Sequence, residues 1–346
     1  MKNFFISLTF LLLSFAQANG QDRHFSQFYA APLLLNPALT GAFDGKYRVN
    51  MIYRDQWRGV LDQPFKTFAA NFDLRFPLTS VMQSKDAAGL GITFYSDKVG
   101  NLDFNTNSII ISGSFHKSLN PQNSQYLSVG VQGGISQRNV NYENFTFQDQ
   151  FNGLTGYTFP TGELLPENSF AFGDLSVGLN YSFAPKDGVG FFAGVAMYHI
   201  LQPKITFYDA AKGGNAILPR RISAQTSANI PLSGSVNFSP RLLVQLQNKH
   251  LELNAGSNFR IQLSEDNRTA LNLGIWARPV KTYQNKLELD ALIGQLGFEY
   301  ESLLFGFAYD ANLSSYATYK KGQGAFEISV TYIGNYDNDD KMCPSF

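Results

Sequence analysis

The fold of this chain is decided by residues 175–183, which read LSVGLNYSF. Apolar side chains occupy every second position of this stretch, and small or polar residues occupy the positions between them. Successive side chains of a β-strand point to opposite faces, so the stretch predicts a strand with one apolar and one polar face. Residues 250–262 (HLELNAGSNFRIQ) and 324–332 (GAFEISVTY) repeat the pattern. The chain is therefore expected to be all-β.

Composition separates a membrane barrel from a soluble sandwich, which would show the same alternation. Charged residues make up only 16% of the chain, against roughly 25% in a soluble domain. Glycines such as Gly130, Gly256 and Gly274 lie on the polar face. No stretch of the expected mature chain is apolar over the ~18 residues that a transmembrane helix needs. A chain that is apolar overall but never continuously so is typical of a transmembrane antiparallel β-barrel, which leaves no strand edge unpaired in lipid.

The alternating segments predict about fourteen strands. Both of the longest gaps, at about 139–171 and 201–219, follow odd-numbered strands, as expected if long loops face the cell exterior. The alternation slips within residues 286–300, which predicts a one-residue bulge at Gly294 or Gln295. The expected strand cores are 46–57, 66–76, 88–97, 104–116, 124–138, 172–183, 189–200, 220–230, 239–247, 250–262, 268–278, 286–300, 302–312 and 324–333.

The chain begins with an export signal and divides into four parts. Lys2, an apolar run over residues 4–15 and the small-x-small triplet ending at Ala18 predict a signal peptide cleaved before Asn19. Residues 19–45 lack strand periodicity and are expected to fold inward as a plug. The barrel is expected over residues 46–333, followed by a periplasmic tail over 334–346.

Charged residues of the barrel are predicted to face its interior, because a lone charge facing lipid costs roughly 2–4 kcal/mol near the bilayer centre. Such charges form either a paired, solvated lumen or a selectivity filter. The balance of 27 basic and 27 acidic residues gives no basic excess for binding nucleic acid. The inward set is Arg48, Arg54, Asp73, Arg75, Arg221, Glu252, Arg260, Arg278, Asp310 and Glu327.

The sequence predicts no enzyme, metal site or cofactor. The four histidines are scattered without the convergent partners of a zinc site. No nucleophile elbow or phosphate-binding glycine loop is present. The acidic run at Asp337, Asp339 and Asp340 lacks the glycine and distal glutamate of a calcium loop, which favours a solvated tail.

Several stretches together resemble the PorP/SprF family of outer-membrane proteins of the type IX secretion system. They are QDRHFSQFYAAPLLLNPALTG at residues 21–41, YRDQW at 53–57, KTF at 66–68, LPRR at 218–221 and the terminal CPSF. The chain departs from the family pattern at residues 22–24, which read Asp-Arg-His where many members have Asp-Pro-His. The resemblance implies a fourteen-stranded, FadL-like barrel with a plug whose motif is Asn36, Pro37, Ala38 and Gly41.

What the resemblance implies for function is a non-catalytic part of type IX secretion and, in some members, of gliding motility. Such a protein assists export or cell-surface anchoring of proteins with C-terminal signal domains. The implied partners are this cargo, periplasmic or outer-membrane secretion components and the lipid bilayer. The implied location is the outer membrane of a Gram-negative, Bacteroidota-type bacterium. A FadL-like transporter of a hydrophobic small molecule is the alternative.

Three regions are candidates for partner binding, and each also has an explanation that involves no partner protein. Aromatic loop residues suit interface hot spots and equally suit an interfacial aromatic girdle. Paired arginines suit carboxylates and equally suit lipid headgroups. A tail after the last strand suits docking to periplasmic components or solvated disorder. The candidates are Phe145, Phe147, Asp149 and Gln150 in the first region, Arg220 and Arg221 in the second, and Cys343, Pro344 and Phe346 in the third.

Overall fold

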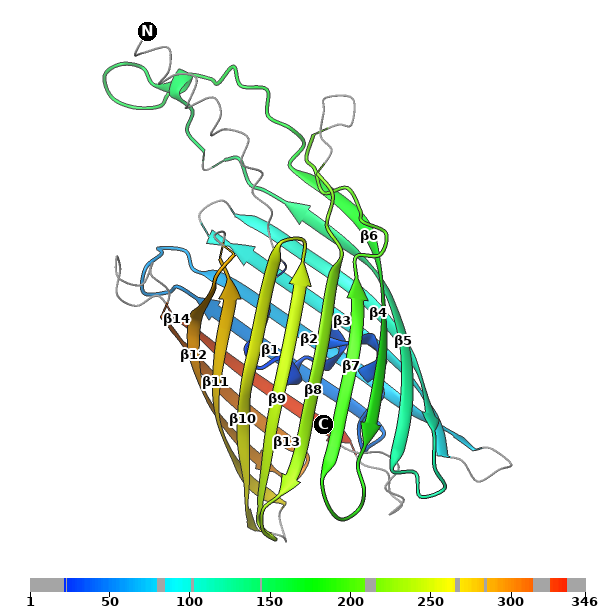
Figure 1. Ribbon diagram of the computed structural model, residues 1–346. Coiled ribbons are helices and arrows are strands. Elements are labelled where there is room, and N and C mark those ends of the chain that lie inside the picture. The colour runs from blue at the N-terminus through cyan, green and yellow to red at the C-terminus, as the bar shows by residue number, and fades with distance from the viewer. Residues whose placement is uncertain are drawn as a thin grey trace.

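The computed structural model is an antiparallel β-barrel with an elongated loop at one end (Figure 1). Fourteen strands pair with their sequence neighbours, and β1 pairs with β14 to close the barrel. The predicted fold class is therefore confirmed. The structure describes residues 22, 24–79, 85–100, 103–143, 145–208, 216–264, 268–282, 285–313 and 324–334.

The predicted strand cores agree with the observed strands to within a few residues. Alternation located them because each strand has lipid on one side and the polar interior on the other. The strands are β1 Tyr47–Gln56, β2 Phe65–Thr79, β3 Lys85–Val99, β4 Phe104–Ser118, β5 Gln125–Asn139, β6 Ser169–Phe183, β7 Gly190–Tyr198, β8 Arg221–Pro231, β9 Val236–Gln247, β10 His250–Ser264, β11 Thr269–Lys281, β12 Leu287–Tyr300, β13 Leu303–Asn312 and β14 Gly324–Gly334.

Strand β6 shows the predicted faces most clearly. Leu175, Val177 and Leu179 are exposed on the outer surface of the barrel, whereas Ser176 and Asn180 are buried inside it. Within the described ranges, no helix has the length and apolarity of a membrane span.

The connections differ between the two ends of the barrel. The longest ones, residues 140–168 and 199–220, both follow odd-numbered strands. Every connection after an even-numbered strand is short, as at residues 119–124 and 184–189. We call the two ends the long-loop end and the short-turn end.

The N-terminal segment, residues 22–45, lies inside the barrel (blue in Figure 1). It contains three short helical turns, η1 Phe28–Ala30, α2 Pro32–Leu35 and η2 Pro37–Leu39. Prolines open α2 and η2, where a missing N–H costs no helical hydrogen bond. Asp22 contacts His199, which directly follows β7, and Arg221 of β8 near the long-loop end, and the segment enters β1 at the short-turn end. It therefore runs along the interior of the barrel.

Apolar packing joins this segment to one side of the barrel wall. Phe28 meets the Trp276 ring edge to face, with 5.3 Å between ring centroids. Trp276 is only 1% exposed. Leu35 and Leu39 join the same cluster, together with Ile293 of β12.

The bulge predicted at Gly294 or Gln295 is instead at Asp290. Arg278 pairs with Ala291 and the next residue of β11 pairs with Leu289, so Asp290 is the extra residue. Beyond it, β12 pairs with β13 in continuous register. The predicted position was wrong because the faces already change at Asp290: Leu289 is exposed, whereas the small apolar side chain of Ala291 packs inside with Phe28 of the N-terminal segment.

Candidate functional site

The asparagine of the NPALTG motif fixes the middle of the N-terminal segment. Asn36 Oδ1 accepts a hydrogen bond from the Ala38 backbone N–H at 2.9 Å, which caps η2. Its Nδ2 donates to the backbone carbonyls of Leu179 and Val195, at 3.1 and 3.3 Å. One side chain thus shapes the segment and attaches it to both β6 and β7.

Glycines of the barrel wall make room for this motif. A Cβ at Gly178 would lie 1.9 Å from Asn36 Oδ1, and one at Gly130 would lie 2.3 Å from the Pro37 carbonyl carbon. The segment can approach the wall this closely only because these positions carry no side chain. This is a physical reason for glycine on the polar face of β5 and β6.

A carboxylate of β14 holds the segment toward the long-loop end. Glu327 accepts hydrogen bonds from the backbone N–H groups of Ser26 at 2.6 Å and Gln27 at 2.8 Å. It also pairs with Arg54 of β1 at 2.5 Å. Glu327 is 0% exposed, so an uncompensated charge here would be costly.

The Ser26 hydroxyl extends this network to two further strands. It donates to Asp310 of β13 at 2.7 Å. It accepts from Arg54 at 2.9 Å and from Arg278 of β11 at 3.0 Å. Both arginines also pair with Asp310 at 2.9 Å. We call these residues, with Gln27 and Glu327, the outer lock.

A second network holds the segment nearer the short-turn end. Arg48 donates two hydrogen bonds to Asp73, at 3.0 and 2.8 Å. Asp73 accepts from the Gly41 N–H at 2.7 Å, and Arg75 donates to the Gly41 carbonyl at 2.8 Å. Gly41 has a φ of 69°, which favours glycine. These four residues form the inner lock, and the predicted paired interior is confirmed at both locks.

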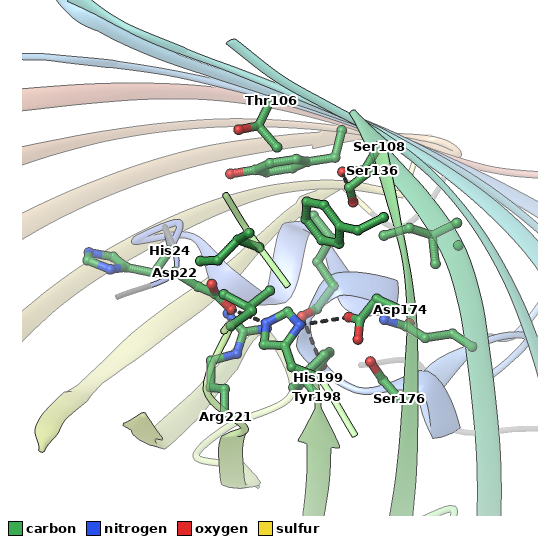
Figure 2. Close-up of a pocket in the computed structure, with 18 of the residues that line it drawn as sticks. Asp22, His24, Thr106, Ser108, Ser136, Asp174, Ser176, Tyr198, His199 and Arg221 are labelled. Carbon is green, nitrogen blue, oxygen red and sulfur yellow. Dashed lines mark hydrogen bonds and ion pairs between the residues drawn. The ribbon is translucent and has the colours of Figure 1, made fainter. Parts of the chain in front are cut away.

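A cavity of about 770 Å³ lies between the N-terminal segment and the long-loop end of the barrel. Apolar side chains of the segment form one side, and polar side chains of β4, β5 and β6 form another (Figure 2). Its volume lies within the ~300–1,000 Å³ range of small-molecule sites. We call it the vestibule. Labelled lining residues are Asp22, His24, Thr106, Ser108, Ser136, Asp174, Ser176, Tyr198, His199 and Arg221.

An ion cluster fastens the start of the segment to the vestibule wall. His199, directly after β7, contacts Asp22 through Nε2 at 2.5 Å and Asp174 through Nδ1 at 2.7 Å. Arg221 lies 3.4 Å from Asp22. Its guanidinium carbon lies 4.1 Å from the centroid of the Tyr198 ring. Figure 2 shows the side chains of Asp22, Asp174 and His199 converging, with Arg221 beside them.

The cluster shifts the pKa values of its members outside the strands. Burial lowers the pKa of His199, but hydrogen bonds to Asp174 and Asp22 outweigh it and raise the pKa to about 9. Burial raises the pKa of Asp22, but the charge of Arg221 and the hydrogen bond from His199 lower it well below its ordinary value. His199 is therefore an imidazolium between two carboxylates at neutral pH.

The loop over residues 140–168 carries its own internal structure. Asn152 Oδ1 accepts from the backbone N–H groups of three residues, at 3.0, 2.8 and 3.1 Å. The rings of Phe151 and Tyr157 lie 5.3 Å apart. Leu154 is 90% exposed and Leu164 is 94% exposed. The loop thus has an ordered backbone from which large apolar side chains project into the surroundings of the barrel.

The four loop residues predicted to bind a partner have two different roles in the structure. Asp149 accepts from Thr161 at 3.1 and 3.0 Å and from the Gly162 N–H at 2.6 Å. Gln150 accepts from the Phe147 N–H at 2.8 Å. The Phe145 ring lies between those of Tyr142 and Phe147 in tilted contacts, with centroid separations of 5.9 and 6.5 Å. Asp149 and Gln150 therefore shape the loop.

The other predicted candidates have different positions. Arg221 points into the vestibule, whereas its neighbour Arg220 is exposed. The cleavage site at Ala18 and Asn19 and the tail candidates Cys343, Pro344 and Phe346 lie outside the described residues.

Sequence reasoning missed the most exposed loop residues and the ion cluster. Leu154 stands alone in a polar stretch and Leu164 is followed only by Leu165, so neither belongs to a periodic pattern that would signal its exposure. Asp174 and His199 meet across the neighbouring strands β6 and β7, whereas Asp22 reaches them only because the N-terminal segment lies inside the barrel.

His24 and His116 both contribute to holding the N-terminal segment. His24 lies 3.0 Å from Glu252 of β10. His116 of β4 contacts the Thr40 carbonyl at 2.8 Å and Ser128 at 2.7 Å. In the part of the chain that the structure describes, no group of three or more acidic, His or Cys side chains is arranged to hold a metal ion.

Comparison with known proteins identifies one family. The family described as type IX secretion system membrane protein PorP/SprF matches residues 17–332. No curated protein matches the sequence.

Solved structures with a similar barrel are distant in sequence. A FadL homologue from Pseudomonas aeruginosa is 13% identical, with a TM-score of 0.48 over 86% of this chain and 92% of that one. The toluene transporter TbuX from Ralstonia pickettii is 10% identical, with a TM-score of 0.48 over 88% and 94%. BamA from Haemophilus ducreyi, lacking POTRA domains 1–3, is 9% identical, with a TM-score of 0.41 over 83% and 70%. The family match is therefore the comparison that bears on function.

Proposed function

The chain belongs to the PorP/SprF family of type IX secretion system membrane proteins, and from this premise we propose that it is a non-catalytic scaffold at the cell surface. Membership and the barrel fold place it in the outer membrane of a Gram-negative bacterium, with a role in type IX secretion. In the proposal, it receives exported proteins that carry C-terminal signal domains and assists their export or surface anchoring.

One observation carries the proposal: buried ion pairs hold the N-terminal segment across the barrel interior. The outer lock attaches it to β1, β11, β13 and β14. The inner lock attaches it to β1 and β2. Removing one partner of a buried pair typically costs 3–5 kcal/mol, so two locks make displacement of the whole segment expensive. A barrel whose interior is blocked in this way is better suited to binding a protein partner than to letting a solute pass through.

The same locks weigh against a transporter of hydrophobic molecules. Such a solute would have to pass the segment or leave through the wall. The segment is fixed at both ends, and Asn36 ties its middle to β6 and β7. Transport would require at least one of these attachments to open.

The proposed contact surface is the loop over residues 140–168. It rises from the long-loop end, which faces the cell exterior if the N-terminus enters from the periplasm. Large exposed apolar residues on a supported loop are suited to anchor a protein partner. Leu154 and Leu164 are the strongest candidates because they are almost fully exposed.

Replacing both leucines tests this proposal. We expect Leu154→Ser with Leu164→Ser to reduce co-purification of secretion partners about tenfold, which corresponds to about 1.4 kcal/mol. The matched control is Leu232→Ser, an exposed leucine in the turn at the opposite end. Undiminished co-purification and surface delivery of cargo in the double variant would count against the loop as the contact surface.

A further inference from the structure

The vestibule has features of a binding site that the locks do not explain. It lies on the long-loop side of the N-terminal segment, and the outer and inner locks use other residues. Its lining combines apolar side chains of the segment, such as Phe25 and Leu34, with hydroxyl and amide groups of the strands. An occupant must therefore satisfy both kinds of surface.

Several buried polar atoms of the lining have no hydrogen-bond partner within the described part of the chain, and two of them belong to uncharged side chains of the strands. Gln132 Oε1 and Thr106 Oγ1 are both buried in this way, and their residues are 6% and 8% exposed. Both side chains line the vestibule. A buried polar atom without a partner costs about 1–3 kcal/mol, so an occupant that supplies the missing partners would gain affinity.

The positions of these two groups favour an extended occupant. Thr106 of β4 is opposite Arg138 of β5, and Gln132 is six positions before Arg138 on β5. At about 3.3 Å per residue, the two groups are separated by about 20 Å along the strand direction. That length matches about six residues of extended polypeptide.

The chemistry of the wall favours peptide over an acyl chain. Gln132 Oε1 accepts a hydrogen bond and the Thr106 hydroxyl can donate one, and a peptide backbone offers both an N–H and a carbonyl. An acyl chain would leave both groups unsatisfied. The apolar surface of Phe25, Phe28 and Leu34 is available for hydrophobic side chains of the same peptide.

The vestibule is continuous with the proposed contact loop. The loop over residues 140–168 joins β5 to β6, and both strands line the cavity near their loop ends through Arg138 and Phe172. The Arg138 guanidinium lies 5.4 Å from the centroid of the Phe172 ring and 6.0 Å from that of Phe104. A protein seated on this loop is therefore next to the cavity.

We propose that the vestibule binds a short, extended, partly apolar segment of the secretion partner that the outer loop holds. This inference rests on the proposed function and adds to it a second contact inside the barrel. In this arrangement the loop provides the first contact and the vestibule provides specificity.

Photo-crosslinking in cells tests the inference. The crosslinker p-benzoylphenylalanine is placed at Ser136, which lines the vestibule, and at its neighbour Ile135, which is 66% exposed on the lipid face. A third position, Leu154, reports on the loop. We expect adducts with one contiguous segment of the co-purifying partner from positions 136 and 154, and none from position 135.

The other outcomes separate the two proposals. A partner adduct at 154 without one at 136 overturns the vestibule site and leaves the proposed function standing. Lipid adducts, or only internal adducts with the chain's own N-terminal residues, at position 136 also overturn it. Absence of partner adducts at both positions contradicts the proposed function as well.

A substitution at the unsatisfied amide gives a second measurement. Gln132→Leu keeps the side-chain size and removes the acceptor, and we expect about tenfold weaker partner association. Ile135→Leu on the same strand is the control, and heat-modifiable migration on gels checks that both variants fold. Equal association of the two variants would overturn the role of Gln132.

Discussion

Glu327 is the single residue whose change we expect to destabilise the barrel most. Glu327→Gln keeps the shape but removes the charge that faces Arg54 and the backbone N–H groups of Ser26 and Gln27. Loss of one partner of a buried pair costs about 3–5 kcal/mol. Urea unfolding followed by the fluorescence of buried Trp276 measures the loss. Glu163→Gln, on the exposed loop, is the control, and equal midpoints for the two variants would contradict this account.

His199 makes the attachment of Asp22 depend on pH. Its pKa is raised from 6.5 to about 9 in the folded protein, so its contribution is fully present below pH 6.5 and is lost as pH rises through about 9. The pKa of Asp22 is lowered from 3.8, so its contribution is present above that value and is lost as pH falls below it.

The attachment is therefore expected to be strongest between these limits. Amide hydrogen exchange in the first turns of the N-terminal segment, corrected for intrinsic rates, should be slower at pH 6 than at pH 10. In His199→Gln this pH difference should largely disappear. An unchanged difference in the variant would show that another group controls the attachment.

At the level of single residues, alternation predicted which charges face inward but not which of them meet. Arg54 and Glu327 were both assigned to the polar face, and both are buried there. Their contact depends on the pairing of β1 with β14, which closes the barrel. No local pattern encodes that closure, so the outer lock could not be read from the sequence.

At the scale of elements, the N-terminal segment packs against the barrel wall only because β5 to β7 carry glycines where it makes contact. Gly178→Ala would place a methyl group against Asn36 Oδ1, which must then move away. We expect a loss of about 1–3 kcal/mol, typical of overpacking, measured as a lower thermal midpoint. The control is Gly294→Ala, where a Cβ meets nothing within 4 Å. Equal midpoints would mean that the segment is not seated on this wall.

Strand β12 shows where sequence-based reasoning at the element scale reaches its limit. A change of phase in the alternation correctly indicated a bulge but placed it after Ile293. Ala291 and Ile293 are apolar and continue the alternation of Leu287 and Leu289, yet both pack inside near Phe28. An apolar residue inside a barrel is indistinguishable by period from one outside until its neighbour across the interior is known.

For the whole molecule, the N-terminal segment inside the barrel predicts that the intact protein does not conduct ions. The intact protein in planar lipid bilayers should show no steady conductance, because both locks hold the segment in the lumen. Deletion of residues 24–41 should open a conducting path, since a barrel of this size encloses space beyond its own side chains. Steady conductance of the intact protein, equal to that of the deletion variant, would contradict closure.

The overall architecture was the most predictable feature, and the site was the least predictable. Fourteen strands, their faces and the two long loops follow from period-two patterning and turns. The vestibule combines side chains of the N-terminal segment with those of β3 to β9, and its shape depends on barrel closure. The role in secretion was indicated by the resemblance to the family and by no motif of catalysis or ligand binding.

The most direct test of the central claim, a surface scaffold for secreted proteins, is native co-purification. Outer membranes are solubilised gently, the protein is captured, and its companions are identified and quantified. We predict stoichiometric recovery of a large exported protein with a type IX C-terminal signal domain, or of secretion-system components. Recovery of the barrel alone, together with passage of a small hydrophobic solute in proteoliposomes, would contradict the scaffold and support a transporter.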